Sequence, residues 1–113
     1  MKLAIVGSRT WKDWLAIHSR ISKLKPSMVI TGGAAGADRM AMDSAERNNI
    51  WLEVYYPEWD KFGRKAGAVR NKQIVDACDK LIAFWDGKSK GTKISIDMAE
   101  SKGKLMEVVL PLA

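Results

Sequence analysis

The residues best suited to chemistry form one glycine-rich run, Gly32-Gly33-Ala34-Ala35-Gly36-Ala37-Asp38. Glycine allows the backbone to adopt positive φ and leaves no side chain in the way of a ligand. Where such a run opens a helix, the free N–H groups of the first turn and the positive end of the helix dipole favour a phosphate. The run therefore predicts a phosphate-binding turn, with ligand contacts from Gly32, Gly33, Ala34, Gly36 and Ala37.

Asp38, at the end of this run, has two interpretations. It bonds a ribose or a base of the ligand, or it serves only as a first-turn acid that complements the helix dipole. The run lacks the Gly-Lys-Ser/Thr of a P-loop, and it does not follow the first strand as a dinucleotide fingerprint does. A tight turn rich in small residues, with no ligand, is the alternative for the whole run.

Two further segments carry arginines that suit an anionic ligand. In Gly7-Ser8-Arg9, which follows an apolar run, we expect all three residues at the ligand, while Thr10 is expected to cap the next helix. Arg70-Asn71 lies in a basic stretch, and arginine favours bidentate contacts with phosphate. A salt bridge within the protein is the alternative for Arg70.

Asp86–Thr92 is polar, is bounded by glycines and precedes a helical pattern. The segment is similar to a second anion-binding loop, with ligand contacts from Ser89, Gly91 and Thr92. Thr92 is equally suited to be a helix cap.

Three of these polar residues are the candidates for catalysis, namely Asp38, Arg70 and Asp86. A zinc site of the usual kind is not expected, because the chain has one histidine and one cysteine. No cofactor is expected either, and whether the chain is an enzyme is left open by these residues.

Apolar and helical segments alternate along the whole chain. The strands are expected at Lys2–Val6, Met28–Thr31, Trp51–Tyr55, Lys80–Trp85 and Leu105–Leu110. Helices are expected between Thr10 and Pro26, then at Ala37–Asn48, Gly67–Cys78 and Thr92–Lys102, with an irregular loop at Pro57–Lys65. This alternation predicts one α/β domain over residues 1–113, with a five-stranded parallel sheet and helices on both faces.

The four candidate segments all follow strands of this sheet. In parallel sheets, ligands bind at the carboxyl ends of the strands. The formal net charge is +6, and the basic residues at this edge are Arg9, Lys61, Arg64, Lys65, Arg70, Lys88 and Lys90. Their position favours an anionic partner, either a phosphorylated small molecule or a nucleic acid, over a merely solvated basic surface.

Other features of the composition concern location and packing. No apolar run approaches the roughly 20 residues of a membrane span, and the first apolar run is too short for a signal peptide, so a cytoplasmic protein without membrane contact is expected. Among the five tryptophans, Trp14 and Trp51 are expected in the core. Trp59 and Trp85 lie near the ligand edge, where they stack on a base or pack within the core or an oligomer.

Four motifs in this order resemble a known family. They are Gly-Ser-Arg after the first strand, Gly-Gly-Ala-x-Gly-Ala-Asp after the second, Ala-Gly-x-x-Arg-Asn, and Ser-x-Gly-Thr after the fourth. The sequence resembles the YspA-like (cpYpsA-related) branch of the SLOG superfamily, whose relatives include the DprA/Smf DNA-processing proteins and the LOG phosphoribohydrolases. The resemblance implies a Rossmann-like sheet ordered 3-2-1-4-5, a nucleotide-related ligand at its edge, self-association and a setting in bacterial or phage conflict systems.

The comparison with LOG enzymes bears on catalysis. That family cleaves the N-glycosidic bond of nucleoside monophosphates with an arginine, which corresponds to Arg70, and a glutamate. The glutamate lies three residues after a Gly-Thr that corresponds to Gly91-Thr92, and Ser95 stands in its place. A serine cannot act as a carboxylate base, and the Pro-Gly-Gly that precedes the Gly-Thr in LOG enzymes is also missing.

Three functions follow as hypotheses. The first is a module that binds a nucleotide or a nucleotide-derived ligand, such as an ADP-ribose-like or cyclic compound, as a sensor or a sequestering protein. The second is a hydrolase that cleaves an N-glycosidic or phosphate bond of such a ligand. The third is single-stranded DNA binding, as in DprA relatives.

Overall fold

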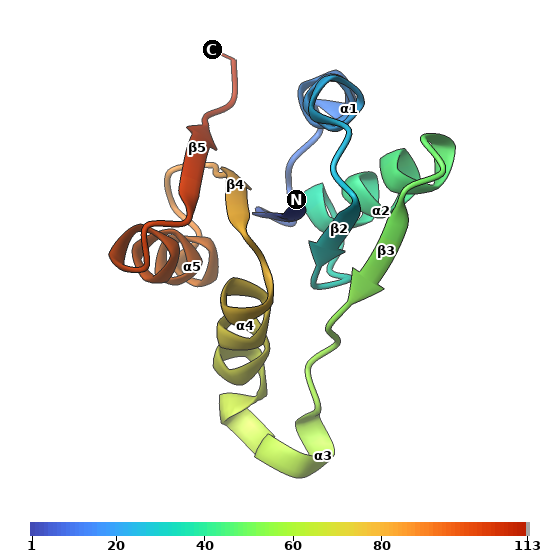
Figure 1. Ribbon diagram of the computed structural model, residues 1–113. Coiled ribbons are helices and arrows are strands. Elements are labelled where there is room, and N and C mark those ends of the chain that lie inside the picture. Colours follow the sequence, from blue (N-terminus) through green and yellow to red (C-terminus); the bar gives the residue numbers. More distant parts are fainter. Residues whose placement is uncertain (113) are drawn as a thin grey trace.

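Five parallel strands form the centre of the computed structural model, which describes residues 1–112. They are β1 (Lys2–Gly7), β2 (Met28–Thr31), β3 (Trp51–Val54), β4 (Lys80–Phe84) and β5 (Leu105–Val109). Their order in the sheet is β3-β2-β1-β4-β5, and each neighbouring pair is parallel. The predicted Rossmann-like α/β fold and its strand order are thereby confirmed (Figure 1).

The helices cover both faces of the sheet. They are α1 (Trp14–Leu24), α2 (Ala37–Arg47), α3 (Trp59–Phe62), the 3₁₀ turn η1 (Gly63–Lys65), α4 (Ala66–Ala77) and α5 (Lys90–Ser101). One core cluster packs α1 and α2 against one face, with Ile17, Ile21 and Ala41 at its centre. The other packs α4 and α5 against the opposite face through residues such as Ile74 and Ile96.

The connections differ from the sequence prediction at three places. Asp13 rather than Thr10 caps α1, and its Oδ1 accepts a hydrogen bond from Ala16 N at 3.1 Å. The expected irregular loop, Pro57–Lys65, contains α3 and η1. Thr92 lies inside α5, which begins at Lys90. Thr92 therefore does not cap that helix.

Trp51 was expected in the core, and this expectation is wrong: 78% of its surface is exposed. The reason is that β3 is an edge strand of the sheet. Trp14 is half-buried and stacks on His18 of α1, with 4.8 Å between ring centroids. The guanidinium of Arg47 from α2 lies 5.6 Å from the Trp14 ring centroid, so Trp14 packs between α1 and α2 rather than deep in the core. Within residues 1–112, no helix has the length and apolar character that a bilayer crossing requires.

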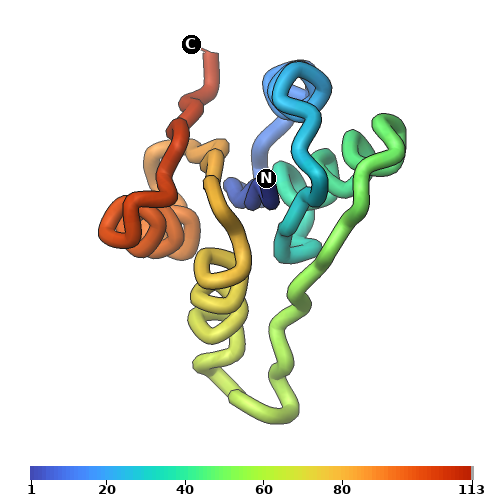
Figure 2. The backbone as a smooth tube through the Cα atoms, in the orientation of Figure 1, coloured from blue at the N-terminus to red at the C-terminus, as the bar shows by residue number. Residues whose placement is uncertain are grey.

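The chain makes its widest excursion between β3 and α4. The segment with α3 and η1 leaves the sheet after β3, and the chain returns through α4 to β4, which lies on the other side of β1 from β2 (Figure 2). In a parallel sheet, this segment and the loops after β1, β2 and β4 all start from the same edge. The fold thus brings the four candidate segments of the sequence to one side of the molecule.

Candidate functional site

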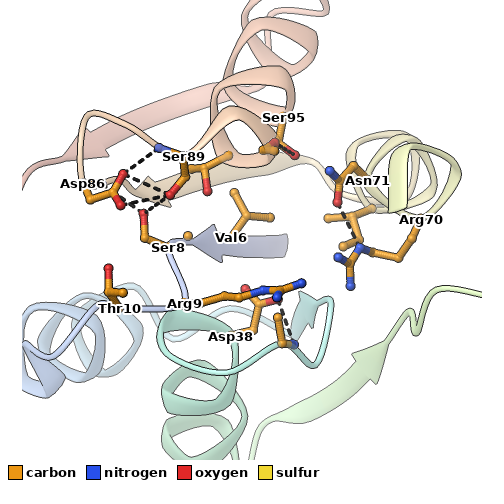
Figure 3. Close-up of a pocket in the computed structure, with 15 residues that line it drawn as sticks. Val6, Ser8, Arg9, Thr10, Asp38, Arg70, Asn71, Asp86, Ser89 and Ser95 are labelled. Atoms are coloured by element: carbon orange, nitrogen blue, oxygen red, sulfur yellow. Dashed lines mark hydrogen bonds between the residues drawn. The ribbon is translucent and has the colours of Figure 1, made fainter. Parts of the chain in front are cut away.

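A cavity of about 340 Å³ opens at the carboxyl edge of the sheet, where these loops meet (Figure 3). Of the predicted ligand residues, those that line it are Gly7, Ser8, Arg9, Ala34, Asp38, Arg70, Asn71, Ser89, Gly91 and Thr92. Val6, Thr10, Ile74, Asp86 and Ser95 complete its wall. We call it the central cavity, since it lies where the chain order reverses between β1 and β4, the place where parallel α/β sheets bind ligands.

Asp38 is the most unusual residue of the central cavity. Its side chain is 5% exposed, and its Oδ2 accepts a hydrogen bond from Ala34 N at 3.2 Å. Its Oδ1 is buried and has no hydrogen-bond partner within residues 1–112. Burial raises the pKa of Asp38 to about 6, against the opposing effects of the Ala34 N–H and of the Arg70 charge. A buried oxygen without a partner is costly, so Oδ1 suits a ligand that donates a hydrogen bond.

Arg70 approaches Asp38 from the first half of α4. Its Nη1 donates to Gly32 O at 2.6 Å and its Nε donates to Asn71 Oδ1 at 2.9 Å. Burial lowers the pKa of Arg70, and the charge of Arg9 lowers it further, while Asp38 raises it. Figure 3 shows the side chains of Arg9 and Arg70 extending toward one another from opposite sides of the cavity. Two guanidinium groups so placed are suited to share an anion.

The loop after β4 is held by a compact hydrogen-bond network. Asp86 Oδ1 accepts from Lys88 N and from Ser89 N, each at 2.8 Å, and from Ser89 Oγ at 3.0 Å. Ser8 Oγ accepts from Asp86 N at 3.0 Å and from Ser89 Oγ at 3.1 Å. The amides of Ser89 and Lys88 lower the pKa of Asp86 to about 2, so this carboxylate stays ionised and fixes the loop. Asp86 is therefore poorly suited to donate a proton in catalysis.

The first turns of α5 form the far wall of the central cavity. Ser95 is 2% exposed, lines the cavity, and its Oγ donates to Gly91 O at 3.4 Å. Thr92 is also buried in this wall. The position that carries a glutamate in LOG enzymes thus faces the cavity, but it presents a hydroxyl group.

The glycine turn contacts the protein itself more than the sequence suggests. Gly36 has φ +77°, and its Cα packs so closely on the backbone oxygens of Ser8 and Arg9 that no side chain fits there. Ala37 N donates to Ser8 O at 3.3 Å. Gly36 and Ala37 line neither this cavity nor the one beside it. They join the loop after β2 to the loop after β1, and so they position Ser8 and Arg9.

A second cavity of about 300 Å³ adjoins the first and shares Arg9, Ala34 and Arg70 with it. Gly32 and Gly33 of the predicted site line this outer cavity, and Arg70 and Asp38 pack over Gly32. Its other residues are Ala35, Arg39, Tyr56, Pro57, Trp59 and Gly67. Among these, Trp59 was noted from its position near the ligand edge and Gly67 belongs to the Ala-Gly-x-x-Arg-Asn motif, whereas Arg39 and Tyr56 carry no motif that points to a site.

Metal chemistry has no evident centre in this arrangement. In the part of the chain that the structure describes, no group of three or more histidine, cysteine, aspartate or glutamate side chains is placed to hold an ion. The central cavity is lined by two arginines, by hydroxyl groups and by the carboxyl groups of Asp38 and Asp86.

Known structures share this fold. DNA processing protein A (DprA) from Streptococcus pneumoniae matches 99% of the chain with a TM-score of 0.82 and 20% sequence identity, and the chain spans 50% of that protein. DNA processing protein A from Helicobacter pylori, whose structure describes a single-stranded DNA binding mode, matches 100% of the chain with a TM-score of 0.75 and 19% identity. The chain spans 66% of this second structure. At such identities, the likeness concerns the fold.

Sequence relatives are more specific. The Gene 61 protein of Mycobacterium phage D29 is 34% identical in an alignment that covers 90% of this chain and 90% of that protein. The sequence model described as YspA, cpYpsA-related SLOG family matches residues 1–62, which hold β1 through α3 and the whole glycine turn. The resemblance seen in the four motifs is thereby confirmed, and the chain belongs to the YspA, cpYpsA-related SLOG family.

Proposed function

We propose that this protein binds a nucleotide or a nucleotide-derived ligand in the central cavity, as a sensor or a sequestering module. One observation carries the proposal: Arg9 and Arg70 converge across the cavity beside Asp38, whose buried Oδ1 has no partner within residues 1–112. A phosphate would neutralise the two guanidinium groups, and a ribose hydroxyl or a base N–H would satisfy Oδ1. A nucleotide offers both groups in one molecule.

Membership of the SLOG family supports a ligand of nucleotide or nucleic-acid type. In the proposed complex, Arg9 and Arg70 contact the phosphate, together with the hydroxyl of Thr92. Ser89 contributes mainly through its position, because its hydroxyl already takes part in the Asp86 network. Gly7, Ser8, Ala34, Asn71 and Gly91 complete the wall around the ligand.

Thermal-shift profiling tests the proposal, with a panel of nucleoside monophosphates, ADP-ribose variants and cyclic nucleotides. Arg9→Ala is the informative variant, since Arg9 lies in the site and forms no salt bridge with the residues of 1–112. Arg64→Ala is the matched control, because exposed Arg64 lines neither cavity. We expect a shift that R9A reduces and R64A leaves intact. No shift with any member of the panel would contradict the proposal.

Hydrolysis of the same ligand is the second candidate function. Asp38 favours it, since a buried carboxyl with a pKa of about 6 is able to hold or release a proton near neutral pH. Ser95 counts against LOG-type cleavage, because no carboxylate stands at that position. Incubation with nucleoside monophosphates, followed by chromatography of wild type and Asp38→Asn, decides between binding and turnover. Hydrolysis is excluded for these substrates if they remain unchanged over a long incubation.

Single-stranded DNA binding is the third candidate. It draws on the fold shared with DNA processing protein A and on the net charge of +6. Gel retardation of a labelled oligonucleotide at low salt tests it directly.

Self-association and a cytoplasmic location remain predictions. Size-exclusion chromatography with light scattering measures self-association.

A further inference from the structure

The outer cavity differs from the central cavity in its chemistry. Two exposed aromatic side chains line it, Tyr56 and Trp59, with 59% and 57% of their surfaces exposed. Large aromatic rings at an open cavity are typical platforms for flat ligand groups, and bases stack on them irrespective of their identity. The central cavity has no aromatic residue in its wall.

The two aromatic residues are held in place by local structure. Tyr56 follows β3, and its ring lies directly against the backbone of Gly33, where a Cβ atom would collide with it. Trp59 is the first residue of α3, and Pro57, two residues earlier, lines the same cavity. Neither ring is needed to fill the core, since neither belongs to the two core clusters. Both rings are therefore available to contact a ligand in the outer cavity.

The arginines connect the two cavities. Arg9 and Arg70 line both of them, and Arg39 adds a third guanidinium to the outer one. Among residues 1–112, none of the three forms a salt bridge. A phosphate held by Arg9 and Arg70 would therefore lie at the boundary, with room for one ligand group on each side.

We infer that the ligand is a dinucleotide, meaning two nucleosides joined through phosphate, with its second base stacked on Tyr56 and Trp59. This inference rests on the proposed function and extends it. Each cavity alone lies at the lower end of the range of roughly 300–1,000 Å³ for small-molecule sites, and the two together reach its middle. A mononucleotide fills the central cavity and leaves the aromatic platform unused.

Isothermal titration calorimetry tests the inference with three probes: AMP, diadenosine diphosphate with a 5′–5′ link, and the 5′-phosphorylated dinucleotide pApA with a 3′–5′ link. The two dinucleotides distinguish a free diphosphate-linked ligand from a nucleic-acid fragment. We expect at least one of them to bind about tenfold more tightly than AMP. Trp59→Ala should remove most of that gain and leave AMP binding unchanged.

Trp51→Ala is the matched control, because Trp51 is equally a surface tryptophan and lines neither cavity. It should leave the affinities for all three probes unchanged. If the dinucleotides bind no more tightly than AMP, the inference is overturned and the proposed function stays intact. The same holds if W59A and W51A lose equal amounts of dinucleotide affinity. If long single strands bind but neither dinucleotide binds more tightly than AMP, the dinucleotide inference is overturned in favour of single-stranded DNA as the ligand. Failure of all three probes overturns the inference, and the thermal-shift panel then decides separately on the proposed function.

Discussion

At the scale of single residues, Asp38 is the side chain most sensitive to pH. Its pKa is about 6 in the folded protein and 3.8 is its ordinary value. Between these values the folded state retains a proton that the unfolded state has released, so raising the pH favours unfolding. Stability should therefore fall from about pH 4 to about pH 7 by on the order of 3 kcal/mol through this group. Urea unfolding at pH 4 and pH 7.5 measures it.

The variant Asp38→Asn isolates this effect from other groups, since its side chain does not titrate. We expect D38N to be more stable than wild type at pH 7.5 and to lose most of the difference by about pH 4, where Asp38 is protonated in the folded state and the unfolded state begins to bind the same proton. The low pKa values of Asp76 and Asp86 act in both proteins alike and cancel in the comparison. A larger free energy of unfolding for wild type than for D38N at pH 7.5 would show that the buried Asp38 carboxylate does not destabilise the folded protein.

Ser8 gives a second prediction at this scale. Its hydroxyl accepts hydrogen bonds from Asp86 N and Ser89 Oγ, and the residue is 2% exposed. Ser8→Ala leaves Asp86 N without its acceptor, while Ser89 Oγ keeps Asp86 as a partner, so we expect a loss of about 1–2 kcal/mol in the free energy of unfolding. Ser27→Ala, at an exposed residue, should change it by less than about 0.5 kcal/mol. Equal effects of the two variants would contradict the structural role of the network.

At the scale of elements, the glycine turn is the joint between the loops after β1 and β2. Gly36 has φ +77° and ψ −125°, a conformation almost restricted to glycine, and its Cα packs on the backbone of Ser8 and Arg9. Gly36→Ala should cost about 1–3 kcal/mol from the backbone alone, with a further loss from the collision. It should also weaken nucleotide binding, because Arg9 moves with its loop.

Gly67 is the matched control for this prediction. It lies in the first turn of α4, and a Cβ atom there meets open space. Gly67→Ala should therefore stabilise the protein by about 0.5–1 kcal/mol, the opposite sign to G36A. Thermal and urea unfolding of the two variants check the signs. Destabilisation by both to the same extent would show that the backbone at Gly36 is not special.

The elements also show what the sequence can and cannot predict. Strand positions follow from local patterns, because each apolar run is bounded by glycine, proline or polar residues, and the parallel arrangement follows from their alternation with helices. The order 3-2-1-4-5 was implied only by the family resemblance. Local patterns predict wrongly that Trp51 is buried, because its apolar run has the same pattern as a central strand. Only the order of the strands in the sheet makes β3 an edge strand. Thr10 and Asp13 are both good helix caps by type, and the structure selects Asp13.

The candidate site was predictable to a similar degree. The sequence predicts one shared site for the glycine turn, Arg9, Arg70 and the loop after β4, because the carboxyl ends of parallel strands meet at one edge of the sheet. The outer cavity was not predictable as a whole, because Arg39 and Tyr56 come from α2 and from the end of β3 with no shared motif. Likewise, the sequence indicates that Gly36 is conformationally special but not that Ser8 and Arg9 occupy the space beside it.

At the scale of the whole molecule, the net charge of +6 separates a small ligand from a strand through the effect of salt. A nucleotide held by Arg9 and Arg70 engages few charges, so its affinity should weaken only a few-fold between 50 and 200 mM salt. A single strand that covers several phosphates releases counterions, and its affinity should fall by orders of magnitude over the same range. Titrations of AMP and of an oligonucleotide at both salt concentrations measure the two slopes. We expect the affinity for AMP to depend weakly on salt and to be lost in R9A. We expect negligible oligonucleotide binding at 200 mM salt. A steep fall for an oligonucleotide that binds more tightly than any nucleotide at 50 mM would instead assign the basic edge to single-stranded nucleic acid.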